Sequence, residues 1–224
     1  IDDFDQTKIL RDYITDQELY EKIVDRYESK KSNEDLFIMS ISMQNHGGYT
    51  EKYDNFDEKA RMLGINYPDV NQYLSLIHES DSALEYLISY FEKVDDPVEI
   101  VFFGDHQPSL SSSFYPYLNG KGLGGLTLSE LENLYTVPFF IWTNYDSGKE
   151  SVELTSLNYL STLALERAGI ALPAYNQFLA DMMEEIPAVN SRGFYSKSQG
   201  KFLHVEDAAG EDAKWLKNYE ILQY

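Results

Sequence analysis

The sequence has 224 residues, of which 43% are hydrophobic, 25% charged and 14% aromatic. This length and composition exclude a disordered, collagen-like or low-complexity chain and are typical of a globular domain with its own core. Eighteen basic against 38 acidic residues give a formal net charge of −20, so nucleic acid and anionic lipid head groups are poor partners for the average surface.

The first half of the chain predicts one strand between two helices. Thr15, followed three residues later by Glu18, predicts a capping box and a helix to about Glu28. The apolar run Leu36–Met43 predicts a buried strand of the kind found in parallel sheets, and a glycine turn with polar side chains follows it. Apolar residues then recur every three or four positions from Asp69 to Lys93, which predicts a long helix.

The second half predicts two further strands among shorter helices. The strands are expected at 98–103 and 137–142, and the helices at 129–134, 156–168, 175–185 and 212–222. Residues 109–127 are rich in serine, glycine and tyrosine and predict a long loop, while 190–205 are weakly patterned.

Alternation of strands and helices predicts an α/β fold with a largely parallel sheet flanked by helices. We find no internal repeat and no linker, so we expect one domain over residues 1–224. The sequence contains no run of about 18 apolar residues, so no segment is predicted to span a membrane. The chain begins at Ile1 without a recognisable signal peptide, and we expect it to be part of a longer protein whose domain is incomplete on the N-terminal side.

Two of the three predicted strands end in a tight polar loop that holds a histidine, and ligands of α/β sheets bind at such strand ends. Asp105 and His106 follow the strand at 98–103 and could offer a carboxylate oxygen and an imidazole nitrogen to one divalent cation. The alternative is a surface turn in which Asp105 caps the loop and His106 is solvated.

The other loop, Asn45 to Tyr49, follows the strand at 36–43. His46 could bind a phosphate or a sugar hydroxyl, or act as a general acid, and Asn45 adds an amide donor and acceptor. The alternative is a glycine-requiring turn in which His46 has no role.

The remaining candidates favour structural interpretations. His78 suggests a surface or boundary position, and His204 has no glycine turn or carboxylate cluster beside it. Asp81 interrupts the apolar face of the long helix and suggests a structural hydrogen-bond partner. The absence of cysteine excludes disulfides, thiolate metal sites and a cysteine nucleophile. The sequence also lacks the P-loop, GxSxG, HExxH and GxGxxG motifs.

Taken in order, Ser42–Tyr49 and Val101–Pro108 resemble the lipoteichoic acid synthase branch of the alkaline phosphatase/sulfatase superfamily. Ser156–Leu160 and Tyr219–Tyr224 resemble later helices of that branch. The resemblance implies an alkaline phosphatase/sulfatase-like fold. It also implies a membrane-anchored parent of Gram-positive type, with this domain at the extracellular face of the cell membrane.

The activity implied by the resemblance is transfer of glycerol phosphate from a phosphatidylglycerol-type lipid to a cell-surface glycan or polymer. It would proceed through a covalent threonine intermediate with one Mn²⁺ or Mg²⁺. Asp105 and His106 match two of the family's metal ligands. His46, next to Asn45, matches the histidine that contacts the glycerol phosphate.

The resemblance implies that the family's nucleophilic threonine and metal-binding glutamate lie upstream of this chain. Thr7 and Thr15 lie in polar or helix-start contexts, which do not suit a nucleophile. We therefore expect a C-terminal part of a catalytic domain that is inactive alone. Arg11, Arg61 and Arg167 are too scattered in sequence to predict a phosphate clamp.

Two alternatives stay open. A sulfatase or phosphodiesterase of the same superfamily would use the same Asp-His pair, with water resolving the intermediate. A non-catalytic ectodomain would bind cell-wall polymer or a partner protein without a metal.

Overall fold

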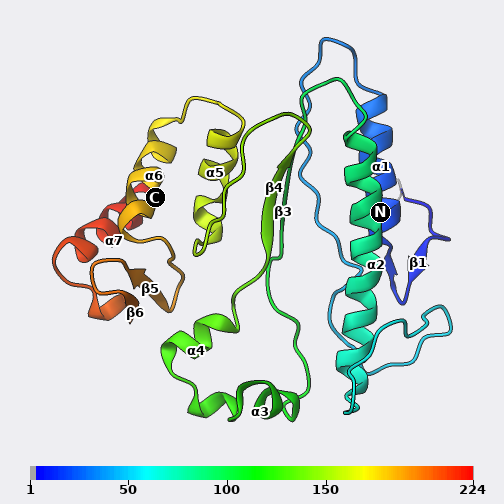
Figure 1. Cartoon of the computed structure of the whole chain (residues 1–224), viewed down its shortest axis with the longest axis horizontal. Coiled ribbons are helices and arrows are strands. Elements are labelled where there is room, and N and C mark those ends of the chain that lie inside the picture. The colour runs from blue at the N-terminus through cyan, green and yellow to red at the C-terminus, as the bar shows by residue number, and fades with distance from the viewer. Residues whose placement is uncertain (1–3, 224) are drawn as a thin grey trace. The chain divides into compact units, whose positions relative to one another are not determined.

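The computed structural model describes residues 4–223, which form two compact units (Figure 1). The first unit comprises residues 4–96 and 108–122, and the second comprises 97–107 and 123–223. The expectation of one domain over residues 1–224 stays a prediction.

The first unit is mainly helical. Its elements are β1 (Ile9–Leu10), β2 (Tyr13–Ile14), α1 (Asp16–Glu28), α2 (Pro68–Phe91) and α3 (Phe114–Asn119). β1 and β2 pair as an antiparallel hairpin that the sequence did not predict.

The start of α1 is where the sequence predicts it. The Thr15 hydroxyl accepts a hydrogen bond from the Glu18 N–H at 3.1 Å, which satisfies one free donor of the first turn. The Glu18 carboxylate instead accepts from the Asp5 N–H at 3.0 Å and pairs with Lys8 at 3.0 Å. The side chain expected to complete the capping box therefore ties the N-terminal segment to the helix.

Helices α1 and α2 lie side by side (Figure 1). The buried residues between them are Tyr20 and Val24 of α1 with Ala83, Leu87 and Phe91 of α2. The Tyr27 ring meets the Phe91 ring edge-on, with centroids 5.2 Å apart. This apolar face is the one that the three-and-four spacing predicts.

The first turns of α2 carry buried polar side chains that hold an irregular segment. The Ser75 hydroxyl accepts from the backbone N–H groups of Lys59 and Ala60 at 2.9 and 3.0 Å. The Asn71 side-chain oxygen accepts from the Met62 N–H at 2.9 Å. These bonds satisfy backbone donors that have no place in a helix or sheet.

The predicted strand at Leu36–Met43 is not formed. This segment carries no strand assignment in the described chain. Phe37, Met39 and Ile41 are 89%, 73% and 72% exposed, so alternate side chains of the apolar run face solvent. A strand requires a hydrogen-bonded neighbour, and no described residue between 4 and 223 pairs with this segment as a strand.

This exposed segment predicts binding of an apolar dye. We expect the 224-residue chain to enhance the fluorescence of anilinonaphthalene sulfonate, and a Phe37→Ser, Ile41→Ser double variant to lose at least about half of that signal. The matched control is Leu63→Ser, which removes a single residue that is equally exposed. Equal dye binding by the double variant and the wild type would show that the segment is covered in solution.

The second unit contains two two-stranded sheets and several helices. Its elements are β3 (Glu99–Phe103), α4 (Leu128–Asn133), β4 (Phe139–Thr143), α5 (Leu160–Arg167), α6 (Ala174–Glu185), β5 (Gly193–Ser196), β6 (Lys201–His204) and α7 (Gly210–Leu222). Short 3₁₀ turns cover Leu123–Gly125, Leu157–Tyr159 and Val205–Asp207.

The α/β class is confirmed, but the strands of the described chain are not paired as expected. β3 and β4 form an antiparallel pair, with Glu99 opposite Thr143 and Phe103 opposite Phe139. All three two-stranded sheets within residues 4–223 are antiparallel. The parallel arrangement was inferred from order along the chain, which does not fix strand direction when the connection is long and irregular.

A compact core holds the helices of the second unit together. It consists of the buried side chains of Tyr159, Leu179, Met182, Ile186 and Phe194. The Tyr159 hydroxyl donates to the Ile186 carbonyl at 2.6 Å, so the one polar atom of this buried ring is satisfied.

Two segments hold more structure than the sequence indicates. The weakly patterned residues 190–205 contain the β5–β6 hairpin, and the expected loop at 109–127 contains α3 and a 3₁₀ turn. No helix within residues 4–223 is long and apolar enough to cross a membrane.

Candidate active site

Asp105 and His106 follow the end of β3, as predicted, in a loop held against the segment before β4. The Gly104 N–H donates to the Pro138 carbonyl at 3.0 Å, and the Gln107 side-chain amide donates to the Thr136 carbonyl. A Cβ at Gly104 would lie 3.0 Å from the Val137 side chain, so glycine permits this close approach.

The two side chains are presented to solvent next to each other. Asp105 is 76% and His106 64% exposed by side-chain area, with Oδ2 and Nε2 3.6 Å apart. Asp105 Oδ1 accepts from the His106 N–H at 2.8 Å, and His106 Nδ1 lies 2.9 Å from the Gln107 carbonyl. A neutral ring with its proton on Nδ1 donates to that carbonyl and leaves the lone pair of Nε2 free.

This pair fits a divalent cation as two of its ligands. Two neighbouring ligands that each lie about 2.1 Å from an octahedral cation, the geometry that Mg²⁺ and Mn²⁺ prefer, are about 3.0 Å apart. The two exposed side chains would therefore have to approach each other by about 0.6 Å from their separation of 3.6 Å. A carboxylate and an imidazole also suit Mn²⁺ or Mg²⁺ better than they suit a soft metal. No group of three or more potential ligands lies together within residues 4–223, so a cation at this pair would need further ligands.

His46 lies in the first unit, in the loop Gln44–Gly48. Its N–H donates to the Met43 carbonyl at 3.0 Å, which closes a turn, and Gly48 has a φ of 93° that favours glycine. The His46 ring is exposed, and its Nδ1 lies 3.3 Å from the Tyr13 hydroxyl. An exposed imidazole at the tip of a fixed loop can contact an anionic ligand.

Arg11 holds this loop from inside, which sequence reasoning missed. Its side chain is buried and donates to the carbonyls of Gln44, His46 and Gly48 at 2.9, 2.7 and 3.1 Å. The sequence shows none of these contacts, because the acceptors are backbone atoms more than 30 positions away. The one signal that the sequence offers nearby is Tyr13, an aromatic residue two positions after the arginine.

A buried carboxylate holds Asn45 from another direction. The Ser80 hydroxyl donates to Asp16 Oδ2 at 2.5 Å and accepts from the Asn45 amide at 2.7 Å. Tyr49 donates its hydroxyl to the Asn45 carbonyl at 2.7 Å, and burial raises the pKa of Tyr49 to about 12, so this donor stays protonated. Both the backbone and the side chain of Asn45 are therefore fixed.

The buried Asp16 predicts a pH-dependent stability. Burial raises the pKa of this carboxyl group, against the opposing effect of hydrogen bonds from Ser80 and Ser42. The folded state therefore holds the proton more tightly than the unfolded state, so the contribution of Asp16 to the free energy of unfolding is greatest at low pH. That contribution falls as pH rises through the folded-state pKa.

Asp16→Asn should remove this dependence. We expect the variant to gain stability relative to the wild type as pH rises from about 4 to 7, measured by urea unfolding at each pH. Asp25→Asn removes a more exposed carboxylate from the same helix and controls for the loss of charge. A difference between Asp16→Asn and wild type that stays constant over this range would contradict the prediction.

The other residues considered from the sequence lie elsewhere. His78 is exposed on α2, and His204 ends β6. Asp81 is also exposed, so it is not the structural hydrogen-bond partner that the sequence suggested. Its neighbour Ser80 makes such a bond instead, to Asp16. Thr15 caps α1, which fits its helix-start context.

The three arginines do not act alike. Arg61 pairs with Glu58 at 3.4 Å on the surface, and Arg167 donates to the Ser147 carbonyl at 2.6 Å and pairs with Glu150. Only Arg11 of the three touches a predicted site residue.

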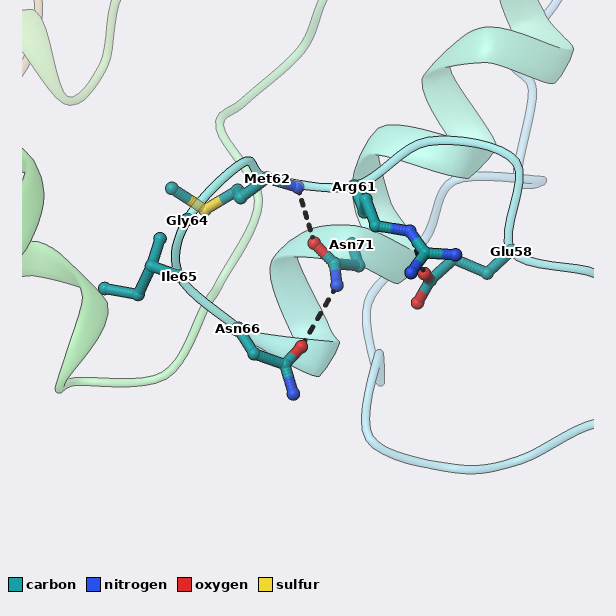
Figure 2. Close-up of a pocket in the computed structure, with 7 residues that line it drawn as sticks. All are labelled: Glu58, Arg61, Met62, Gly64, Ile65, Asn66 and Asn71. Atoms are coloured by element: carbon teal, nitrogen blue, oxygen red, sulfur yellow. Dashed lines mark hydrogen bonds and ion pairs between the residues drawn. The ribbon is translucent and has the colours of Figure 1, made fainter.

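An open pocket near the start of α2 is lined by none of the residues of these loops. It is lined by Glu58, Arg61, Met62, Gly64, Ile65, Asn66 and Asn71 (Figure 2). Asn71 bonds the Met62 N–H and the Asn66 side chain, and Arg61 pairs with Glu58, so these groups bond to each other rather than converge on a ligand.

Comparison with solved structures finds a similar fold in a phosphoglycerol transferase, GacH of Streptococcus pyogenes, in complex with sn-glycerol-1-phosphate. The TM-score is 0.58 at 21% identity, over 80% of this chain and 44% of that one.

Two curated relatives come from Rhizobium meliloti. The capsular polysaccharide biosynthesis protein RkpI is 35% identical over 105 residues, which is 47% of this chain and 18% of that protein. A protein named for cyclic beta-1,2-glucan modification is 22% identical over 217 residues, which is 93% of this chain and 32% of that protein. The chain thus spans a third or less of the length of these relatives.

The sulfatase family model matches residues 2–170, a stretch that contains both histidine loops. Since this match covers most of the chain, and the fold agrees with that of a phosphoglycerol transferase, the chain belongs to the sulfatase family of the alkaline phosphatase superfamily.

Proposed function

We propose that this chain is the C-terminal portion of the catalytic domain of a metal-dependent phosphoglycerol transferase. The observation that carries the proposal is the exposed Asp105–His106 pair at the end of β3, in a chain of the sulfatase family. The substrates are a phosphatidylglycerol-type lipid and a cell-surface glycan or polymer.

Asp105 and His106 supply two ligands to a single Mn²⁺ or Mg²⁺ in this proposal. When bound, such a cation offsets phosphate charge and lowers the pKa of a hydroxyl nucleophile. The nucleophilic threonine and the remaining metal ligand belong to a part of the protein outside residues 1–224.

His46 and Asn45 bind the glycerol phosphate in this proposal. The imidazole donates to a phosphate oxygen when it is protonated, and the Asn45 side chain is part of the network that holds the loop still. Local positive charge is needed because the chain carries a net charge of −20, which repels an anionic substrate.

The fold neighbour and the curated relatives support the substrate classes. The neighbour was solved with sn-glycerol-1-phosphate, and the names of the two relatives concern a polysaccharide and a glucan. We propose in addition that the domain lies at the extracellular face of the membrane, attached to a membrane-anchored remainder, and that its acceptor is a glycan.

The fate of labelled phosphoglycerol tests the proposal. The full-length protein, supplied with Mn²⁺, phosphatidylglycerol labelled in the head group and a β-glucan, should release diacylglycerol and move the label to the glycan. Label that appears only as free glycerol phosphate would indicate a phosphodiesterase of the same superfamily. No release of diacylglycerol with or without metal would favour a non-catalytic ectodomain that binds cell-wall polymer.

A further inference from the structure

Arg11 occupies the turn between β1 and β2 with a φ of 55°, a backbone conformation that residues other than glycine rarely adopt. Its side chain is only 4% exposed and points into the first unit. We propose that Arg11 is a positioning residue that fixes the loop Gln44–Gly48 and so aims the His46 ring at the phosphate of the substrate. This role rests on the proposed function of His46.

The contacts of Arg11 converge on the loop. One terminal nitrogen donates to the carbonyls of Gln44 and His46, and the other donates to the Gly48 carbonyl and, at 3.3 Å, to the Gln72 side-chain oxygen. Three carbonyls within five residues are thus tied to one rigid planar group. Gln72 on α2 provides the fourth acceptor of the same group.

Three tyrosines surround the guanidinium group. Its central carbon lies 5.8, 5.5 and 5.8 Å from the ring centres of Tyr13, Tyr49 and Tyr53. These distances allow cation–π attraction. Tyr13 also approaches His46 Nδ1, and Tyr49 bonds the Asn45 carbonyl, so the same rings connect the arginine to both predicted substrate contacts.

The arrangement requires a guanidinium group. Burying a charge is unfavourable unless its donors are satisfied, and here the two terminal nitrogens make four hydrogen bonds while Nε has no partner among the described residues. A lysine ammonium is a single point with three donors and cannot reproduce this planar fork. We therefore expect lysine to keep the charge and lose the loop geometry.

Arg11→Lys in the full-length protein tests this role. Calorimetric titration with sn-glycerol-1-phosphate in the presence of Mn²⁺ reports the dissociation constant and the number of binding sites separately. We expect the dissociation constant to rise by about tenfold or more with the number of sites unchanged, since a displacement of about 1 Å at a site is costly. Arg61→Lys, at a surface ion pair, should bind like wild type.

An unchanged dissociation constant with fewer binding sites would mean that Arg11 serves only folding, and would overturn the inference. If Arg11→Lys does not fold, Gln72→Met frees the guanidinium group from α2 and removes the bond from the Gln72 amide to the Glu51 carbonyl, so the loop is held less firmly. This variant should raise the dissociation constant about threefold, and an unchanged value would likewise overturn the inference. Failure of the wild type to bind sn-glycerol-1-phosphate would instead refute the proposed function, and this role with it.

Discussion

Asp105→Ala in the full-length protein is expected to lower metal-dependent activity at least about 100-fold, because loss of a direct ligand should cost no less than the 10- to 100-fold typical of outer-shell changes. Removing the carboxylate leaves His106 as the only ligand that this loop offers within the described residues. Activity measured against increasing Mn²⁺ should therefore need a far higher metal concentration, or not recover at all.

The control for this variant is Asp181→Ala, which removes an exposed carboxylate from α6 in the same unit. It should retain the activity and metal dependence of the wild type. If Asp105→Ala keeps the metal dependence of the wild type, the ligands lie elsewhere and the assignment of Asp105 and His106 is refuted.

Phe194→Ala is expected to destabilise the second unit by about 3–5 kcal/mol, which is the usual cost of emptying a phenylalanine site in a core. Phe194 is 0% exposed on β5 and belongs to the buried cluster that includes Tyr159 and Met182. The cavity would open beneath both α6 and the β5–β6 hairpin, so little of it can close by local collapse.

Tryptophan fluorescence during urea unfolding measures this effect selectively. Both tryptophans of the chain, Trp142 on β4 and Trp215 on α7, lie in the second unit, and Trp215 packs against the Phe194 cluster. Phe37→Ala makes the same chemical change at a residue that is 89% exposed in the first unit, and should shift the transition by less than about 0.5 kcal/mol. Equal shifts for the two variants would contradict the core as described.

Locally determined features were predictable from the sequence. The Thr15 cap needs only the next three residues, and the apolar face of α2 repeats over many turns, so both were found close to their observed bounds. The segments that became β3 and β4 were also identified as strands. In each case the information lies within a short stretch of chain.

Pairing and burial were less predictable because they depend on distant partners. Leu36–Met43 has the composition of a buried strand, yet within residues 4–223 it has no strand partner and its side chains are exposed. The β5–β6 hairpin was missed for the opposite reason. Its four-residue strands are too short to show a pattern, and they are held by contacts such as that between the Tyr195 and Phe202 rings.

The candidate site shows the same division. A predicted strand followed by a histidine marked both loops from the sequence alone, although only one of the two strands, β3, is formed in the described chain. Arg11 and Asp16 were not identified, because Arg11 acts through backbone carbonyls and Asp16 through Ser80, which lies 64 positions away. The site partners of Arg11 are backbone carbonyls, and backbone atoms are the same at every position. The sequence therefore contains no complementary side chain that would point to this arginine.

The most direct measurement is an anomalous difference map from crystals of the full-length protein grown with Mn²⁺ and sn-glycerol-1-phosphate. We predict a manganese peak within about 2.5 Å of both Asp105 Oδ2 and His106 Nε2, and a phosphate oxygen within hydrogen-bond distance of the His46 ring. A manganese peak bound by other residues, with Asp105 and His106 in solvent, would contradict the proposed metal-dependent transferase.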